Sequence, residues 1–307
     1  MKKNKLTIIA GPTAVGKTAY AIEYAKKNNG EIISLDTIQM YKGLDIGSAK
    51  PTKEELAEVP HYMIDVLMPD VNINIKEFKD MALTYMSKIY EIGKLPILVG
   101  GSGFYINALL FDTDFLYEDD TKVAEIRKDL TEILDEKGVD YLYEMLKEVD
   151  IGATKYIAKE NTRRVIRAIE FFKLHNMPIS EHNAIEKSKE SPYDYTYYVL
   201  NMDRERLYER INRRVDKMIE MGLLKEVKAL INSGYGKELN SMRSIGYNEL
   251  YDFCKERDEI GSIDELNEHD KMKLKLLVDE IKKHSRNYAK RQLTWFKAQQ
   301  NIIWVDM

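Results

Sequence analysis

Near its N-terminus the 307-residue chain reads Leu6-Thr7-Ile8-Ile9-Ala10-Gly11-Pro12-Thr13-Ala14-Val15-Gly16-Lys17-Thr18. Residues 6–10 are an apolar run of strand length, and residues 11–18 fit the pattern G-x-x-x-x-G-K-S/T, which follows a strand and opens a helix. In such a loop, glycines let backbone N–H groups turn inward around a diphosphate, and the helix N-terminus adds positive partial charge. We therefore predict that residues 11–18 bind a polyphosphate, with Lys17 on the phosphate oxygens and Thr18 holding Mg²⁺. The alternative is a glycine-rich turn without a ligand.

Short apolar strands alternate with helical patterns in the first third of the chain. We expect strands at 6–10, 31–35 and 96–99, and helices at 19–28 and 75–92. This alternation is typical of an α/β fold in which helices flank a parallel sheet. Together with the phosphate loop, it predicts a P-loop kinase-like core.

The middle of the chain is acidic and helical. Residues 112–150 hold 14 Asp and Glu against 5 Lys and Arg. Periodic apolar positions predict helices at 123–136, 141–149 and 162–174, the last of them ended by Pro178. We therefore predict a helical insertion domain at 112–196.

The rest of the chain is expected to return to the core domain, which would consist of residues 1–111 and 197–307. Residues 197–202 have the composition of a strand that rejoins the sheet. One long helix is expected at 204–233 and another at 270–299, followed by a closing strand at 302–305.

The composition argues against two broad classes of protein. The chain is 44% hydrophobic and 32% charged, and no uncharged run is long enough to cross a bilayer, so we expect no membrane partner. The single cysteine, Cys254, cannot form a disulfide within the chain, which argues against a disulfide-stapled secreted domain. The N-terminal residues lack the apolar core and cleavage site of a signal peptide, so a cytoplasmic location is expected.

The distribution of charge is uneven. The net charge is −4, yet residues 155–175 carry six Lys and Arg against two Glu, and residues 281–300 carry six Lys and Arg with no acid. Such basic patches fit a nucleic-acid partner. The alternative is that each patch is an ordinary solvated helix face.

The residues that follow two of the expected strands bear on the chemistry. Asp36 follows strand 31–35, so its carboxylate would lie at the carboxyl edge of the sheet beside the phosphate loop. A carboxylate there can accept a proton from an attacking group, and the alternative is a capping role in the next turn. Strand 96–99 is followed by Gly100-Gly101-Ser102-Gly103 instead of the Asp with which a nucleotide hydrolase positions Mg²⁺. This argues against a standard ATPase.

Seven stretches follow one another over nearly the whole chain. They are 11–18 (GPTAVGKT), 36–51 (DTIQMYKGLDIGSAKP), 60–65 (PHYMID), 99–105 (VGGSGFY), 161–170 (NTRRVIRAIE), 243–247 (RSIGY) and 286–296 (RNYAKRQLTWF). In this order they resemble the bacterial tRNA dimethylallyltransferase family, also called tRNA isopentenyltransferases. The resemblance implies transfer of a dimethylallyl group from dimethylallyl diphosphate to N6 of the adenine that is 3′-adjacent to the anticodon in tRNA, with release of diphosphate.

The resemblance also assigns roles to individual residues. It implies that Asp36 is the general base, that Thr18 and Ser102 belong to the catalytic site, and that Arg243 joins residues 11–18 in binding the diphosphate. The leaving group would then lie on the phosphate loop with Mg²⁺ as cofactor. The residues implied to cradle the acceptor nucleotide are Asp36, Thr37, Ile38, Gln39 and Ser102.

A basic stretch of the expected insertion is implied to contact the anticodon loop. It consists of Arg163, Arg164, Val165, Ile166 and Arg167. Arg167 is four residues after Arg163 and three after Arg164, so the three arginines project from roughly one side of a helix. The alternative is a solvated or ion-paired helix face. The protein is expected to act as a monomer.

Two positions depart from the family pattern, and other functions stay open at this point. Asn248 stands where many relatives have a basic residue, which leaves a phosphate contact there in doubt, and Ser102 replaces a common Thr but keeps the hydroxyl. One alternative is a prenyltransferase for free adenine nucleotides, and a less favoured one is a small-molecule kinase. A third is a non-catalytic P-loop module that binds RNA.

Overall fold

The computed structural model describes residues 3–116, 119–261 and 263–307, so Met1 and Lys2 of the N-terminal stretch lie outside the described residues. The chain forms two compact units. The first comprises Met1–Leu110 and Pro192–Met307, and the second comprises Phe111–Ser191. None of the helices in the described ranges has both the length and the apolar composition needed to span a membrane.

A six-stranded sheet forms the centre of the first unit. Its strand order is β3-β2-β4-β1-β5-β6, and every neighbouring pair is parallel. The strands are β1 (Asn4–Ala10), β2 (Gly30–Ser34), β3 (His61–Tyr62), β4 (Leu95–Gly100), β5 (Tyr193–Asn201) and β6 (Ile303–Asp306). This confirms the predicted α/β fold with a parallel sheet. Because β1 lies between β4 and β5, the loop after β1 opens at the carboxyl edge of the sheet, beside the ends of both neighbours.

Helices supply most of the connections between the strands. They are α1 (Lys17–Lys27), α2 (Lys53–Glu58), α3 (Ile75–Glu91), α4 (Gly103–Leu110), α5 (Asp120–Val149), α6 (Thr162–His175), α7 (Ile179–Ser188), α8 (Arg204–Glu220), α9 (Leu223–Asn232), α10 (Tyr247–Lys255) and α11 (Glu268–Lys297), with short 3₁₀ turns at Ala153–Lys155 and Ile263–Glu265. Several begin at side-chain caps that satisfy free backbone N–H groups. In α3, for example, Asn74 and Glu77 form a reciprocal capping box.

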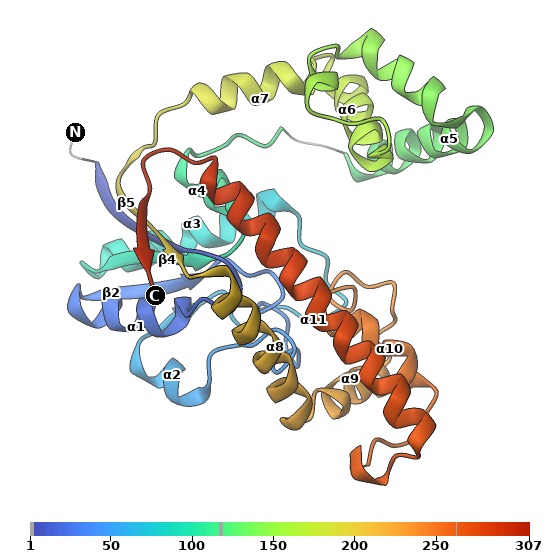
Figure 1. The fold of residues 1–307 in the computed structure, drawn as a ribbon. Coiled ribbons are helices and arrows are strands. Elements are labelled where there is room, and N and C mark those ends of the chain that lie inside the picture. Colours follow the sequence, from blue (N-terminus) through green and yellow to red (C-terminus); the bar gives the residue numbers. More distant parts are fainter. Residues whose placement is uncertain (1–2, 117–118, 262) are drawn as a thin grey trace. The chain divides into compact units, whose positions relative to one another are not determined.

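Both faces of the sheet are covered by helices (Figure 1). On one face, Ile22 of α1 and Leu207 of α8 share a buried cluster with the strand residues Ile9 and Ile97. Successive side chains of a strand point to opposite faces, so buried neighbours such as Ile8 lie on the other face. There α3 packs against β2 and β4. Burial on both faces explains why these strands are continuous apolar runs.

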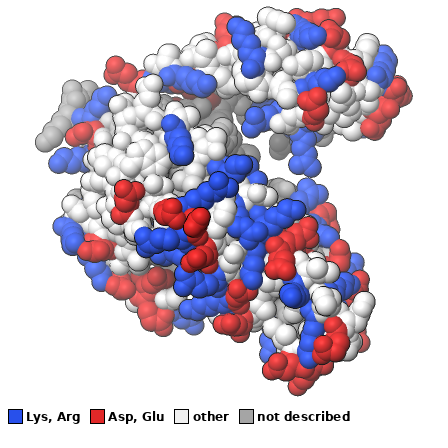
Figure 2. Space-filling model, viewed as in Figure 1, with Lys and Arg blue, Asp and Glu red and all other residues white. Residues whose placement is uncertain are grey.

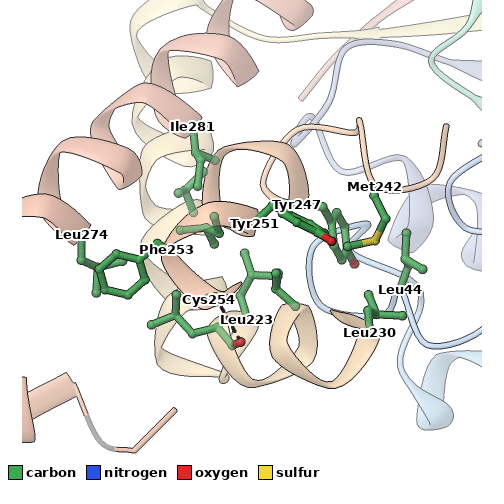
Figure 3. Packing of buried hydrophobic residues seen from close by; sticks show 14 of the residues in the cluster. Leu44, Leu223, Leu230, Met242, Tyr247, Tyr251, Phe253, Cys254, Leu274 and Ile281 are labelled. Carbon is green, nitrogen blue, oxygen red and sulfur yellow. Dashed lines mark hydrogen bonds between the residues drawn. The ribbon is translucent and has the colours of Figure 1, made fainter. Parts of the chain in front are cut away.

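A second cluster joins α9, α10 and the first half of α11. Its members include Leu223, Tyr247, Phe253, Leu274 and Ile281, drawn with their neighbours in Figure 3. This cluster also contains Tyr41 and Leu44, from the segment that follows β2. The packing therefore fixes a segment near the carboxyl edge of the sheet against helices from the last third of the chain.

The helix predicted at 204–233 is wrong, because two helices occupy this range. Between α8 and α9, Gly222 adopts a φ of +100°. A residue with a side chain is disfavoured in this left-handed region, so the glycine ends one helix and begins the next. The helical spacing of apolar residues continues from α8 into α9, so this spacing did not indicate a break at Gly222.

Other boundaries also differ from the sequence-based expectation. Strand β5 begins at Tyr193 rather than at residue 197, because residues 193–196 pair with Asn4–Thr7 of β1. Helix α6 ends at Asn176, whose φ is +50°, and not at Pro178, which instead stands just before α7. Helices α2, α4, α7 and α10 and the short strand β3 were not predicted.

The second unit is helical. The helices predicted at 123–136 and 141–149 are the two halves of α5, whose backbone leaves the helical conformation at Gly138. Leu130 and Leu142 of α5 lie in one buried cluster with Val165 and Ile169 of α6. A short apolar core between antiparallel helical segments thus stabilises this unit.

Substitution of Gly222 by Ala should destabilise the fold through the backbone alone. No atom lies within 4 Å of the position that a Cβ would take there, so the cost comes from forcing a left-handed φ on a residue with a side chain. We expect the free energy of unfolding, measured by urea denaturation, to fall by about 1–2 kcal/mol. Glu220→Ala, at the exposed end of α8, should be nearly neutral, and equal stability of the two variants would contradict the assignment.

Candidate active site

The loop between β1 and α1 is a tight turn whose two glycines adopt left-handed backbone conformations. Gly11 and Gly16 adopt φ angles of +146° and +111°. A Cβ on Gly11 would also lie 2.7 Å from the carbonyl oxygen of Leu200 in β5. Only glycine fits at this point, and the loop turns tightly enough to open α1 at Lys17. The backbone is therefore arranged as the sequence motif predicts.

Lys17 is held over the loop by the backbone of the loop itself. Its Nζ donates to the carbonyl oxygens of Gly11, at 3.0 Å, and Pro12, at 2.8 Å. Burial, reinforced by the nearby charge of Arg214, lowers the pKa of Lys17 to about 8, although Asp36 opposes this shift. An incoming phosphate would replace these carbonyl contacts with stronger charged ones.

Two side chains that the sequence analysis did not single out complete the phosphate side of the site. Arg214 of α8 donates from Nη1 to Oγ1 of Thr13 at 3.2 Å. Gln292 of α11 accepts a hydrogen bond from the backbone N–H of Thr13 at 2.8 Å and donates to the carbonyl oxygen of Gly101 at 3.0 Å. In the sequence, Arg214 directly precedes Val215 of the apolar stripe of α8. This position indicates a partly buried arginine, so the sequence did contain a signal for it.

Asp36 lies beside the loop, in the turn that follows β2. Its Oδ1 accepts a hydrogen bond from the backbone N–H of Ile38 at 3.0 Å, so the carboxylate also caps the turn. Burial raises the pKa of Asp36, while the bond from Ile38 and the charges of Lys17 and Arg214 oppose the rise. A carboxylate with a raised pKa next to a phosphate-binding loop is suited to accept a proton.

Gln39 ties this turn to the segment that follows it. The side-chain oxygen of Gln39 accepts from Ser34 Oγ at 3.0 Å, and its Nε2 donates to the carbonyl oxygens of Ser48 and Ala49, both at 3.4 Å. Asp36 and Gln39 are therefore positioned by contacts on both sides of the turn.

These groups line one cleft of about 890 Å³ in the first unit. Lys and Arg side chains, with a few acids between them, gather over α8 and the middle of α11 (Figure 2). Among the charged residues that line the cleft, eight Lys and Arg face two acids, Asp36 and Glu55, and such an excess of cations concentrates anionic ligands. Its lining includes Lys17, Thr18, Asp36, Ile38, Gln39, Arg210, Arg214, Arg243, Tyr288 and Arg291.

A smaller pocket of about 70 Å³ shares Lys17 and Asp36 with this cleft. Part of its lining is apolar and comes from Ala21, Ile32 and Val99. The site therefore offers an apolar recess directly next to the groups that bind phosphate, which suits a ligand with a short hydrocarbon chain.

The glycines after β4 have a packing role. A Cβ on Gly101 would lie 2.1 Å from Nε2 of Gln292, and one on Gly103 would lie 2.0 Å from the ring of Trp295. The missing side chains let α11 approach the end of β4 and place Gln292 against the phosphate loop. Ser102 is half-buried at the start of α4 and lines neither cavity, and neither does Thr37.

The basic stretch of α6 lies in the second unit. Arg163 and Arg164 are exposed, whereas Val165 and Ile166 are buried in the core of that unit. The side chains of Val165 and Ile166 are thus occupied by packing and offer no surface to a partner. Arg167 donates to the buried carboxylate of Glu170.

No group of three or more His, Cys, Asp or Glu side chains that could hold a metal ion occurs among the residues that the structure describes. Thr18 contributes a hydroxyl to the cleft, close to where phosphates would lie. Mg²⁺ typically binds through substrate phosphates, waters and only one or two protein groups. A single hydroxyl at this position is compatible with such a shared site.

A parallel sheet, a phosphate loop after its first strand, two cations over the loop and a carboxylate beside it are the features of a P-loop protein. The sequence matches the family model described as IPP transferase over residues 39–299, which places the protein among transferases. The chain belongs to this family.

Similar proteins cover nearly the whole chain. It is 46% identical to a tRNA dimethylallyltransferase of Lachnoclostridium phytofermentans, over 98% of this chain and 91% of that protein. It is 43% identical to one of Acetivibrio thermocellus, over 99% and 92%.

Solved structures of similar proteins support the same family membership. The crystal structure of the tRNA isopentenylpyrophosphate transferase from Bacillus halodurans has a TM-score of 0.67 and 39% identity, covering 99% of this chain and 90% of that one. A eukaryotic dimethylallyltransferase acting on tRNA has a TM-score of 0.77 and 25% identity, covering 99% and 74%.

Replacement of Arg214 by Ala should weaken binding of inorganic pyrophosphate. The guanidinium borders the loop, and a hydrogen bond to a charged group contributes enough that we expect an affinity loss of about tenfold to a hundredfold. Isothermal titration calorimetry measures this directly. Arg206→Ala removes an exposed arginine from the same helix and serves as the control. Equal affinities of the two variants would exclude Arg214 from the anion site.

The affinity for pyrophosphate should also fall as the pH rises through about 8, the lowered pKa of Lys17. Lys17 is protonated below its pKa and neutral above it, so its attraction for the anion is lost on the alkaline side. In Lys17→Arg the cation stays charged, and titration of pyrophosphate itself is common to both proteins. An alkaline loss of equal size in the two proteins would refute this role of Lys17.

Proposed function

We propose that this protein transfers a dimethylallyl group from dimethylallyl diphosphate to N6 of the adenine 3′-adjacent to the anticodon in tRNA, releasing diphosphate. The observation that carries the proposal is a carboxylate, Asp36, beside a phosphate loop in a member of the IPP transferase family. The relatives named above are tRNA dimethylallyl- and isopentenyltransferases, which supports tRNA as the acceptor.

In this proposal the phosphate loop binds the leaving group. Negative charge develops on the diphosphate as the allylic C–O bond breaks, and the backbone N–H groups at the N-terminus of α1, those of Lys17 and Thr18, are proposed to stabilise that charge. Lys17 and Arg214 face the same space from α1 and α8. Arg243, exposed on the wall of the cleft, adds a third cation.

The five-carbon chain is proposed to lie in the smaller pocket. Ala21, Ile32 and Val99 supply apolar surface there. This arrangement would bring the reacting carbon close to the phosphate loop, where bond breaking occurs, and would shield it from water.

Asp36 is proposed to act as the general base. The exocyclic amine of adenine is a weak nucleophile, because its lone pair is delocalised into the ring, so it gains from losing a proton as it attacks. The new bond joins N6 to the allylic carbon, the bond from that carbon to the diphosphate oxygen breaks, and the proton of N6 passes to Asp36. The turn of Thr37, Ile38 and Gln39, together with Ser102, is proposed to contact the acceptor nucleotide.

The tRNA backbone is proposed to contact basic side chains in both units. To enter the cleft, the adenine must leave the stack of the anticodon loop, which costs a few kcal/mol that contacts with the backbone offset. Arg163 and Arg164 are exposed for such contacts, and Arg167 is proposed to join them. Val165 and Ile166 would take part only through their backbone.

Mg²⁺ is proposed as the cofactor, held by the Thr18 hydroxyl and by oxygens of the substrate diphosphate. When bound, it would neutralise charge on the phosphate oxygens. The enzyme is proposed to act as a monomer. A tRNA acceptor suits a cytoplasmic location.

The experiment that tests this function combines the purified protein, Mg²⁺, dimethylallyl diphosphate and unmodified tRNA, followed by nucleoside mass spectrometry. We expect prenylated adenosine from the anticodon loop. AMP and ATP are offered as rival acceptors. We expect tRNA to be preferred to them, because the basic surface over α8 and α11 favours RNA over a free nucleotide. Product on free nucleotides alone, or no product at all, would overturn the proposal.

Asp36→Asn should lower turnover by about a hundredfold or more, since a general base typically contributes this much. The amide keeps the size and the hydrogen bond from Ile38 but cannot take the proton. Binding of tRNA, measured by fluorescence anisotropy, should stay intact. Asp70→Asn, an exposed carboxylate outside the cleft, is the matched control. Full activity of Asp36→Asn would exclude Asp36 as the general base.

Removal of divalent cations with EDTA should abolish transfer, and added Mg²⁺ should restore it. Thr18→Val keeps the shape of the side chain but removes the hydroxyl, so we expect it to need a higher Mg²⁺ concentration for half-maximal rate. Thr84→Val, on an exposed face of α3, is the control. An unchanged Mg²⁺ requirement in Thr18→Val would contradict the assignment.

A further inference from the structure

We propose that Glu226 of α9 is a positioning residue that sets the affinity for the acceptor, by holding segment 45–51, whose residues 47–51 form one wall of the cleft. This inference rests on the proposed function, because it assumes that the acceptor lies on the side of the cleft formed by the turn at Asp36 and by this wall.

Glu226 accepts hydrogen bonds from three successive backbone amides that lie about 180 residues earlier in the chain. Its Oε2 accepts from the N–H of Asp45 at 3.0 Å and of Ile46 at 2.8 Å, and its Oε1 accepts from the N–H of Gly47 at 3.1 Å. A fourth bond, at 2.6 Å, comes from the hydroxyl of Tyr247. Both carboxylate oxygens are thus fully used, and the backbone of this wall is fixed to α9.

Packing reinforces the same contact. Tyr247 is completely buried in the cluster that contains Leu44, Leu223 and Met242 (Figure 3). A Cβ on Gly47 would lie 2.5 Å from the tyrosine ring. Gly47 therefore lies flat against Tyr247, while the ring hydroxyl bonds to Glu226. The wall cannot shift without breaking either the carboxylate contacts or this close packing.

The side chain of Gln39 connects the wall to the turn that contains Asp36. Gly47, Ser48 and Ala49 line the cleft, and the carbonyl oxygens of Ser48 and Ala49 accept from Gln39. Gln39 stands three residues after Asp36 in the same turn. Movement of the wall would therefore move the groups proposed to contact the acceptor nucleotide.

The phosphate loop is held by separate contacts. Gln292 of α11 bonds to Thr13 and Gly101, and Lys17 bonds to the loop backbone. No hydrogen bond described for Glu226 reaches the phosphate loop. The two substrates therefore depend on different sets of hydrogen bonds, here called clamps. The clamp of Gln292 holds the loop proposed to bind the diphosphate, and the clamp of Glu226 holds the wall next to the acceptor.

This separation predicts a split in the kinetic constants of Glu226→Gln. The amide has one acceptor oxygen, and its NH₂ group would face backbone donors, so about half of the clamp would be lost. We expect the KM for tRNA to rise roughly tenfold, with the KM for dimethylallyl diphosphate unchanged. Tyr247→Phe keeps the ring on Gly47 and loses one bond of the four, so its KM for tRNA should rise roughly threefold.

The control variant is Glu220→Gln, which changes an exposed glutamate at the end of α8 and should leave both constants at their wild-type values. A rise of both KM values in Glu226→Gln, or of neither, would overturn the inference. If Glu226 acted only on stability, the loss of folded protein would lower the apparent kcat and leave both KM values unchanged. Thermal unfolding of each variant, measured alongside, identifies that case.

The inference and the proposed function can fail separately. If the wild-type protein transfers no prenyl group, the proposed function fails, and binding of tRNA measured by fluorescence anisotropy decides on Glu226. Weaker binding by Glu226→Gln than by Glu220→Gln would still support the clamp, and equal binding would overturn it. A wild-type protein that neither transfers a prenyl group nor binds tRNA would overturn both.

Discussion

The site depends on the close approach of the phosphate loop to the sheet. Gly11 turns so near to Leu200 of β5 that a side chain would lie 2.7 Å from its carbonyl oxygen. This constraint sends the chain directly from β1 into α1 and so brings the N-terminus of α1, at Lys17 and Thr18, to the cleft. Gln292 then holds Thr13 from the opposite side. The glycines after β4 follow from the same need, because they admit α11 to this position.

The charges around the loop explain how one cleft can serve both reactants. Burial lowers the pKa of both Lys17 and Arg214, and the charge of Arg214 lowers that of Lys17 further, whereas the carboxylate of Asp36 favours the charged form of both. A diphosphate would add the negative charge that this arrangement lacks. Asp36, whose pKa is raised by burial, would then be free to take a proton from the acceptor rather than only neutralise the cations.

Sequence reasoning predicted the parts of the fold that depend on local pattern. The phosphate loop and the position of Asp36 follow from short-range spacing, and the alternation of strands and helices along the chain indicated a parallel sheet, although β1 pairs with β4 and β5 over 90 and 189 residues. Arg214, Gln292 and Glu226 were not singled out, because their roles come from contacts 179–279 residues away in sequence. The break at Gly222 was missed since the apolar period ran across it, although the glycine itself was the available signal. Val165 and Ile166 are buried because α6 packs against α5. The spacing of apolar residues in α6 indicates a buried side of the helix but does not show which helix covers it.

A crystal structure with a non-cleavable analogue of dimethylallyl diphosphate and an anticodon stem-loop tests the central claim most directly. The account predicts the diphosphate on residues 11–18, with Lys17 and Arg214 in contact with its oxygens. It also predicts the adenine amine within hydrogen-bond distance of Asp36, about 3 Å. An adenine amine out of reach of Asp36, or a diphosphate bound away from the loop, would contradict it.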